Sequence, residues 1–93
     1  MKYIFVRWKH SHSDEPVRLY SEIDDNGFEI RKVYVFSDGH FEKADKAKQS
    51  ETTFLSEKPI PALAEINSHT EFEGVEISPE DFATVWEKSE ISN

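Results

Sequence analysis

The first part of the chain alternates apolar and polar side chains in the manner of β-strands. Ile4, Val6 and Trp8 fall on one face of an extended segment, and the residues between them are also partly apolar. Apolar character on both faces favours a strand inside a sheet over a strand at its edge. Two more segments rich in β-branched and aromatic residues follow a polar break at 11–16. The sequence therefore predicts strands over residues 2–10, 17–23 and 28–36.

The dipeptide Asn26-Gly27 joins the second and third of these strands. It predicts a two-residue type I′ hairpin turn, in which both central residues need positive φ. The turn sets a register in which Lys32 opposite Ser21 is the one polar pair on an otherwise apolar face, a candidate position for a β-bulge. The predicted opposing pairs are Asp25 with Phe28, Ile23 with Ile30, Glu22 with Arg31, Tyr20 with Val33, Leu19 with Tyr34, and Val17 with Phe36.

Two further strands are predicted beyond this hairpin. Asp38-Gly39 forms the centre of a second turn that leads into a strand beginning at Phe41. Residues 1–45 are thus expected to form a four-stranded antiparallel meander. A shorter fifth strand is predicted over 72–77, where apolar and polar residues alternate.

The middle of the chain is less regular. Residues 43–50 carry no large apolar side chain and are expected to form either a short exposed helix or a loop. The segment that follows is expected to place Phe54 and Leu55 in the core, as a short strand or as an anchor. Pro61 suits the first position of a short helix that ends at Asn67.

A helix at the C-terminal end is the strongest helical signal. Ser78 suits the N-cap and Pro79 the first helical position, with acidic residues in the first turn. An apolar stripe at helical spacing is expected to dock on the sheet; it comprises Phe82, Val85, Trp86 and Ser89. The predicted fold is one α+β domain over residues 1–93, an antiparallel four- to five-stranded meander sheet with two helices packed on one face.

The charge balance narrows the class of partner. The 93 residues include 19 acidic and 11 basic side chains, a formal net charge of −8. Two regions hold most of the excess: residues 21–30 carry four acids and no base, and residues 71–93 carry seven acids and one lysine. This acidity counts against nucleic acid as a partner, because phosphate binding needs clustered lysine and arginine. It suits either simple solubility or attraction of a basic partner.

Composition excludes several other classes. No apolar run approaches the ~20 residues of a membrane helix, and the first residues lack the apolar core of a secretory signal. We therefore expect a cytoplasmic protein with no membrane partner. The chain contains no cysteine, so it has no disulfide framework and no thiolate metal site.

The chain shows little catalytic chemistry. His10 and His12 are two residues apart, a spacing that presents metal ligands on one side of an extended segment. Further ligands for a small metal-dependent hydrolase would come from Asp14, Glu15, His40 or His69. No nucleophile elbow surrounds a serine, and the three glycines are too isolated to cradle phosphate. We expect no enzyme, no metal and no cofactor, with the hydrolase as the least favoured alternative.

Aromatic residues of the predicted sheet favour a protein-binding role over a catalytic one. The predicted sheet carries Tyr3, Phe5, Trp8 and Tyr20, more aromatic area than one small core must absorb. Large anchors inside a polar rim are typical of protein-binding faces. The alternative is that these side chains fill the core beneath the helices.

A resemblance spans about residues 3–88. Its elements include the strand up to Trp8 with His10, Asp14-Glu15-Pro16-Val17, and the segment 19–24. They continue through Glu29-Ile30-Arg31-Lys32-Val33, Phe36, Asp38-Gly39, Ala44-Asp45, Pro59-Ile60-Pro61, Glu65-Ile66-Asn67 and Glu76-Ile77-Ser78. In these the chain resembles a family of small bacterial proteins of uncharacterised function. It is similar to the cytoplasmic immunity proteins encoded beside polymorphic toxins, including those of contact-dependent growth inhibition.

The resemblance implies a protein that binds and neutralises a cognate toxin, by steric and electrostatic blocking rather than by chemistry. A basic, nuclease-type toxin domain would match the acidic charge. Partner specificity is expected in the loops 11–15 and 43–57. The alternative is a general protein-interaction module without a toxin partner. Candidate contact residues are Asp14, Glu15, Tyr20, Glu22, Asp24, Asp25, Glu73, Glu76, Glu80 and Asp81.

Overall fold

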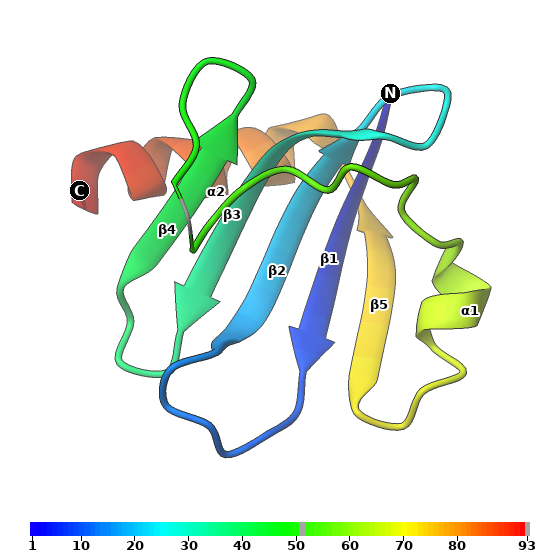
Figure 1. The fold of residues 1–93 in the computed structure, drawn as a ribbon, viewed down its shortest axis with the longest axis horizontal. Helices are drawn as coiled ribbons and strands as arrows, with labels where there is room; N and C mark the ends of the chain where they lie inside the picture. The colour runs from blue at the N-terminus through cyan, green and yellow to red at the C-terminus, as the bar shows by residue number, and fades with distance from the viewer. Residues whose placement is uncertain (51, 93) are drawn as a thin grey trace.

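The computed structural model describes residues 1–50 and 52–92. Its centre is a five-stranded antiparallel sheet with the strand order β4-β3-β2-β1-β5 (Figure 1). The fold class is therefore α+β, as predicted, and the first four strands form the predicted meander. The strands are β1 (Lys2–Trp8), β2 (Pro16–Ile23), β3 (Glu29–Phe36), β4 (Phe41–Asp45) and β5 (Phe72–Ile77), and the helices are α1 (Leu63–Ile66) and α2 (Pro79–Ser92).

The middle of the β2–β3 hairpin has the predicted register. Tyr20 opposes Val33 and Leu19 opposes Tyr34, as the alternation of side chains requires. The ends of the hairpin differ, because Ile23 opposes Glu29 rather than Ile30. The extra residue of β3 makes a bulge one pair away from the position that the sequence favoured. Pro16, rather than Val17, opposes Phe36, with a second irregularity there.

The predicted type I′ turn at Asn26-Gly27 is wrong. Among the described residues only Gly27 and Gly39 have positive φ, so Asn26 lacks the conformation that this turn needs. The carboxylate of Asp24 explains the difference, because its Oδ1 accepts the backbone N–H groups of Asn26 at 2.9 Å and of Phe28 at 3.0 Å. These bonds close a longer loop in which Gly27 alone is left-handed.

Helix α2 covers one face of the sheet. Ser78 caps it as predicted, with its Oγ accepting the backbone N–H of Asp81 at 3.0 Å. Phe82 is completely buried against Val33 and Val35 of β3. The predicted apolar stripe therefore faces the sheet. No helix described here is long and apolar enough to cross a membrane.

Helix α1 lies on the other face, so the prediction that both helices pack on one face is wrong. Leu63 and Ile66 of α1 pack against a cluster that includes Ile4 and Val6 of β1. Gly74 of β5 permits this contact, because a Cβ there would lie 2.9 Å from the Leu63 side chain. The helix is a single turn, and it lies beside β5, at the end of the segment that crosses the face opposite α2 (Figure 1).

Helix α1 also begins later than predicted. Ala62 is its N-cap, so Pro61 precedes the helix instead of occupying its first position. Asn67 ends the helix as predicted and is also its C-cap. The Asn67 side chain reaches β5, where it accepts the N–H of Gly74 at 2.6 Å and donates to its carbonyl at 2.9 Å.

Residues 52–62, which we call the strap, cross the same face on the way to α1. The expectation that Phe54 fills the core is wrong, since its side chain is 52% exposed, whereas Thr53 is buried. Polar bonds hold the strap instead: the Thr53 hydroxyl donates to Glu42, and the Ile60 N–H donates to the carbonyl of Gly27 at 2.7 Å. The prediction of a short helix or a loop over residues 43–50 is wrong for 43–45, which end strand β4, whereas 46–50 form a loop.

Candidate binding groove

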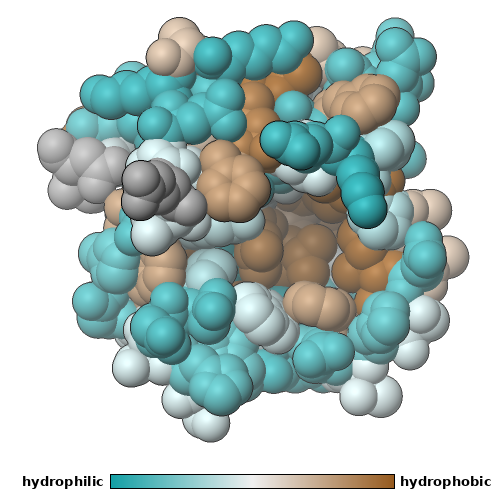
Figure 2. All heavy atoms as spheres, viewed as in Figure 1, coloured by the Kyte–Doolittle hydropathy of each residue, from teal (hydrophilic) through white to brown (hydrophobic). Residues whose placement is uncertain are grey.

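The face opposite α2 is hollowed beside the strap. Two adjoining cavities of about 400 Å³ and 450 Å³ share a wall formed by Leu19, Lys32, Tyr34 and Ser56. Figure 2 shows this face, with hydrophobic side chains at the bottom of a hollow and hydrophilic side chains around it. We call the two cavities together the open groove. Its floor is Ile4, Val6, Leu19, Lys32 and Tyr34, and its sides come from the strap, α1 and the loop before β2.

Strand alternation explains the apolar floor. Ile4 and Val6 of β1 point to the same face as Leu19 of β2, because Val6 and Leu19 are direct cross-strand partners. Leu19 in turn opposes Tyr34 of β3. Ile66 of α1 and the ring of Phe72 extend this surface toward β5. The groove is therefore a continuation of the core that no described segment covers.

A buried ion pair interrupts the apolar floor. The Nζ of Lys32 lies 2.9 Å from Oε1 of Glu29, and the two side chains are only 7% and 4% exposed. Lys32 also donates to the hydroxyl of Tyr34 at 2.9 Å. The carboxylate of Glu29 accepts the Ser21 hydroxyl at 2.7 Å and the backbone N–H of Ser56 at 3.1 Å. The pair thereby ties the sheet to the strap.

The β-bulge is what brings Glu29 and Lys32 together. Residues three apart in a regular strand point to opposite faces of a sheet. The extra residue between them shifts Glu29 opposite Ile23, and both side chains then reach the groove side. Burial by itself lowers the pKa of the Lys32 ammonium, but the facing Glu29 carboxylate and the Tyr34 hydroxyl outweigh it, and the pKa is raised.

Acidic side chains surround the groove. Asp14 and Glu15 line it on the side of the loop before β2, Glu42 at β4, and Glu65 at α1. Lys32 is the only lysine or arginine among the lining residues, and Glu29 neutralises it. The potential of the groove is consequently negative.

Glu42 also takes part in a small exposed cluster. Nδ1 of His40 lies 2.5 Å from Asp38, and its Nε2 lies 3.4 Å from Glu42. The hydrogen bond to Asp38 is the main cause that raises the pKa of His40, and the contact with Glu42 raises it further. The backbone N–H of His40, which donates to Asp38 at 3.0 Å, lowers the pKa of Asp38 most, and the His40 ring lowers it further.

Aromatic side chains form the edge of the groove. The ring centroid of Trp8 lies 5.8 Å from that of Phe72 and 4.4 Å from that of His10. Phe54 stands on the strap with half of its surface exposed. Exposed aromatic side chains beside an apolar floor are the kind of anchors that protein interfaces use.

The histidine pair has a structural role in this loop. Nε2 of His10 donates to the carbonyl of Pro16 at 2.8 Å, and its Nδ1 accepts the backbone N–H of His12 at 2.9 Å. Both ring nitrogens of His10 are therefore engaged in holding the loop between β1 and β2. Within residues 1–50 and 52–92, no three His, Asp or Glu side chains are grouped so as to hold a metal ion.

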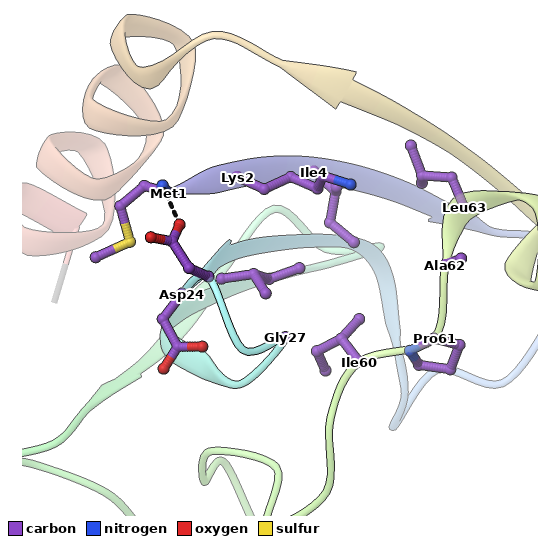
Figure 3. A pocket seen from close by; sticks show the side chains of 11 residues that line it. Met1, Lys2, Ile4, Asp24, Gly27, Ile60, Pro61, Ala62 and Leu63 are labelled. Atoms are coloured by element: carbon purple, nitrogen blue, oxygen red, sulfur yellow. Dashed lines mark hydrogen bonds and ion pairs between the residues drawn. The ribbon is translucent and has the colours of Figure 1, made fainter.

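A third cavity of about 340 Å³ adjoins the groove near the start of β1 (Figure 3). It shares Ile4 and Ile60 with the groove. Asp24 and Asp25 of the β2–β3 turn line it, and Asp25 binds the amino group of Met1 at 3.0 Å. This cavity places the acidic turn on the same face as the groove.

The structure brings some predicted contact residues together and separates others. Asp14 and Glu15 line the groove, and Asp24 and Asp25 line the adjoining cavity. The remaining residues lie elsewhere: Tyr20 and Glu22 beneath or beside α2, Glu73 and Glu76 on β5, and Glu80 and Asp81 in the first turn of α2. Of the predicted specificity loops, 11–15 borders the groove. The segment 43–57 is not a single loop, because 43–45 end β4 and 52–57 begin the strap, which also borders the groove; residue 51 lies outside the described residues.

Glu22 is buried and already occupied. Arg31 donates to it through two nitrogens, at 2.5 Å and 3.0 Å. The guanidinium carbon lies 5.0 Å from the ring centroid of Phe82 and 4.9 Å from that of Trp86. The bond to Arg31 lowers the pKa of the Glu22 carboxyl. Glu22 thus belongs to the packing of α2.

Sequence reasoning missed the inner residues of the groove. Glu29 and Lys32 are three residues apart, a spacing that predicts side chains on opposite faces of a strand. Only the bulge brings both side chains to the same face, and the sequence does not reveal it. The size and apolar character of Phe54 predict a core position, but the polar bonds of its neighbours hold the strap with Phe54 exposed. The one available signal was the polar pair of Lys32 and Ser21 on an apolar face.

The fold and the groove define a small single-sheet α+β protein with an open, acidic-rimmed surface. The chain belongs to the family described as "Domain of unknown function (DUF6881)", whose model matches residues 2–91. No curated protein and no solved structure matches the chain. The family description states no activity.

Proposed function

We propose that this protein is an immunity protein that binds and neutralises a cognate bacterial toxin domain with a basic surface. The open groove is the surface that makes the contact. The observation that carries the proposal is an apolar hollow, open to solvent, with acidic residues around it and with the exposed Phe54 and the half-buried Trp8 and Phe72 at its edge. An apolar hollow rimmed by polar groups marks a binding site in a small protein.

Charge defines the chemistry of the occupant. Among the residues that line the groove, the only lysine or arginine is Lys32, and Glu29 neutralises it. An apolar segment flanked by lysine or arginine therefore fits, with its apolar side chains on Leu19 and Tyr34 and its cations near Asp14 and Glu15. The net charge of −8 adds long-range attraction for such a partner.

The groove is preformed, which favours tight binding. The strap is fixed near one end by Thr53 and near the other by Ile60, and Ser56 bonds to Glu29 between them. A surface that is ordered before binding loses less entropy when the partner docks. Neutralisation follows from occupancy, because a bound immunity protein keeps substrate away from the toxin surface that it covers.

The toxin partner rests on the resemblance described above, whereas the basic and apolar chemistry rests on the groove. A general interaction module would use the same groove with another protein. The reading frame beside the gene separates the two: a toxin-like neighbour supports the immunity function, and its absence favours the module.

The test is protection of cells that express the neighbouring toxin-like protein. The double charge reversal Asp14→Lys with Glu15→Lys is expected to abolish protection, because it places two cations where the partner's cations bind. The matched control, Glu80→Lys with Glu87→Lys, makes the same change in net charge on exposed residues of α2. It should protect almost as well as the wild type.

Two outcomes contradict the proposal. Full protection by the Asp14 and Glu15 variant would remove the groove rim from the contact surface. Loss of protection only in the Glu80 and Glu87 control would move the contact to the C-terminal acids. Thermal unfolding of both variants checks that each remains folded.

A further inference from the structure

A second exposed surface lies on the other face of the sheet, at the end that α2 leaves open. Figure 1 shows α2 crossing the sheet near the end at which β1 begins. Toward the end of β1 the face forms a shallow hollow of about 700 Å³. Four residues of its lining form what we call the arginine patch: Phe5, Arg7, Arg18 and Tyr20.

The two arginines oppose each other without a carboxylate between them. Arg7 of β1 and Arg18 of β2 are direct cross-strand partners, and both are exposed. Like charges in this position repel and destabilise a sheet. Among the described residues, no carboxylate lies within 4.0 Å of the charged nitrogens of either arginine. Glu73, the β5 partner of Arg7, instead lies 3.4 Å from Lys9.

This arrangement is unusual for the composition of the chain. The protein has 19 acidic and 11 basic residues, so carboxylates are available to pair with exposed arginines. The other arginine of the chain, Arg31, is fully paired with Glu22. Two adjacent unpaired arginines therefore point to a ligand that supplies the negative charge.

An apolar row lies directly beside the arginines. Phe5 opposes Tyr20, and their rings are stacked with centroids 4.9 Å apart. Val75 of β5 opposes Phe5 and is 53% exposed. Phe5 and Tyr20 are each two positions from an arginine along their own strand and therefore on the same face, about 7 Å away. Val75 shares this face as the cross-strand partner of Phe5.

We propose that the arginine patch binds an acidic segment of a second protein. Arg7 and Arg18 take its carboxylates, and the row of Phe5, Tyr20 and Val75 takes an apolar side chain beside them. The opposite charge and the opposite face make this site independent of the open groove. The protein would then contact partners of both signs at once, one on each side of the sheet.

Single-stranded nucleic acid fits the patch less well. The rings of Phe5 and Tyr20 stack on each other, so they do not form separate platforms for successive bases. A net charge of −8 also repels a long polyanion more than a short acidic segment. A protein segment satisfies both the apolar row and the arginines.

The test is an NMR titration of the full-length protein with three defined probes. The first is a short synthetic peptide in which glutamate alternates with leucine; the second has lysine in place of glutamate; the third is oligothymidylate. The glutamate peptide is expected to shift the side-chain Nε resonances of Arg7 and Arg18 without affecting Asp14 or Glu15. The double variant Arg7→Gln with Arg18→Gln should weaken this binding about tenfold or more, the loss expected for charge-assisted hydrogen bonds.

A matched control keeps the interpretation specific. Lys46→Gln with Lys48→Gln removes the same charge from exposed residues outside the patch and should leave binding unchanged. The arginine variant should melt at or above the temperature of the wild type, because like-charge repulsion is relieved. A lower melting temperature would identify the arginines as structural and overturn the proposal.

Other results would overturn it as well. The proposal fails if the glutamate peptide leaves both arginine resonances unmoved, or if oligothymidylate binds the patch more tightly than the peptide. Concentration-dependent shifts of the same resonances in the free protein would make a second copy of this chain the occupant. None of these results depends on the groove or on a toxin partner.

Discussion

Two neighbouring residues of β3, Arg31 and Lys32, each bind a glutamate on opposite faces of the same sheet. Arg31 and Glu22 lie beneath α2, where aromatic rings cover the guanidinium. Lys32 and Glu29 lie on the floor of the open groove. One face of this sheet is therefore closed by its own helix, and the other is left open.

The two pairs also form in different ways. Glu22 and Arg31 are direct partners in a regular register, so strand alternation alone brings them together. Glu29 reaches Lys32 only because a bulge turns it to the groove side, where it also bonds to the strap. The helix-side pair thus belongs to packing, and the groove-side pair fixes the shape of a surface.

The largest expected effect contrasts two phenylalanines. Phe82→Ala removes a completely buried ring between α2 and the sheet, and should lower the free energy of unfolding by about 3–5 kcal/mol. Phe54→Ala removes a half-exposed ring at the groove edge and should change it by about 0.5 kcal/mol or less. Urea unfolding measures both. A large loss in the Phe54 variant would mean that the groove edge is part of the core.

The ion pairs should rank next. Glu29→Gln leaves the Lys32 ammonium buried without its counter-charge, and we expect a loss of about 3 kcal/mol. Glu22→Gln should lose about 1–2 kcal/mol, because a third of the Arg31 side chain remains exposed to solvent. Adding Lys32→Met to Glu29→Gln should recover part of the loss. Equal losses in the two single variants would erase the distinction between the pairs.

The two helices should differ in what holds them. Asn67→Ala removes both hydrogen bonds from α1 to Gly74, and should lower stability by about 1–2 kcal/mol. It also uncovers backbone groups on the β5 edge, so self-association should rise in sedimentation experiments. Asn67→Asp, which keeps an acceptor for the Gly74 N–H, should be milder. If neither variant changes the stability, α1 is held by apolar contacts alone.

The smallest expected effect is a difference in pH dependence. The pKa of Glu22 is lowered below 4.5, so its contribution is complete above about pH 4.5 and is lost as pH falls through the folded pKa. The pKa of Lys32 is raised above 10.5, so its contribution is complete below about pH 10.5 and is lost as pH rises through the folded pKa. The difference in urea midpoint between Glu22→Gln and the wild type should therefore disappear at low pH. The difference between Lys32→Met and the wild type should disappear at high pH. Convergence at the same end would contradict the two assignments.

Much of the fold followed from regular alternation. The strands, the central register around Tyr20 and Val33, and the capped helix at Ser78 all depend on local periodicity that the sequence carries. Two predictions, the type I′ turn and the face on which α1 lies, are wrong at places where a side chain forms hydrogen bonds with backbone groups. Asp24 captures two amides and changes the turn, and Asn67 helps to settle α1 on the face opposite α2.

The groove itself was only partly predictable. The charge of Asp14 and Glu15 predicts a contact role, and the structure places both residues at the side of the groove. The floor depends on the bulge before Lys32 and on the strap crossing without filling the hollow, and both are tertiary features. Local sequence patterns do not encode where a long connection crosses a sheet.

Hydrogen exchange on the complex with the neighbouring toxin-like protein tests the central claim most directly. Binding at the open groove predicts slower exchange for backbone amides of the strap and of the loop 11–15, with α2 unchanged. Slower exchange confined to α2, with the strap and the loop unaffected, would contradict it.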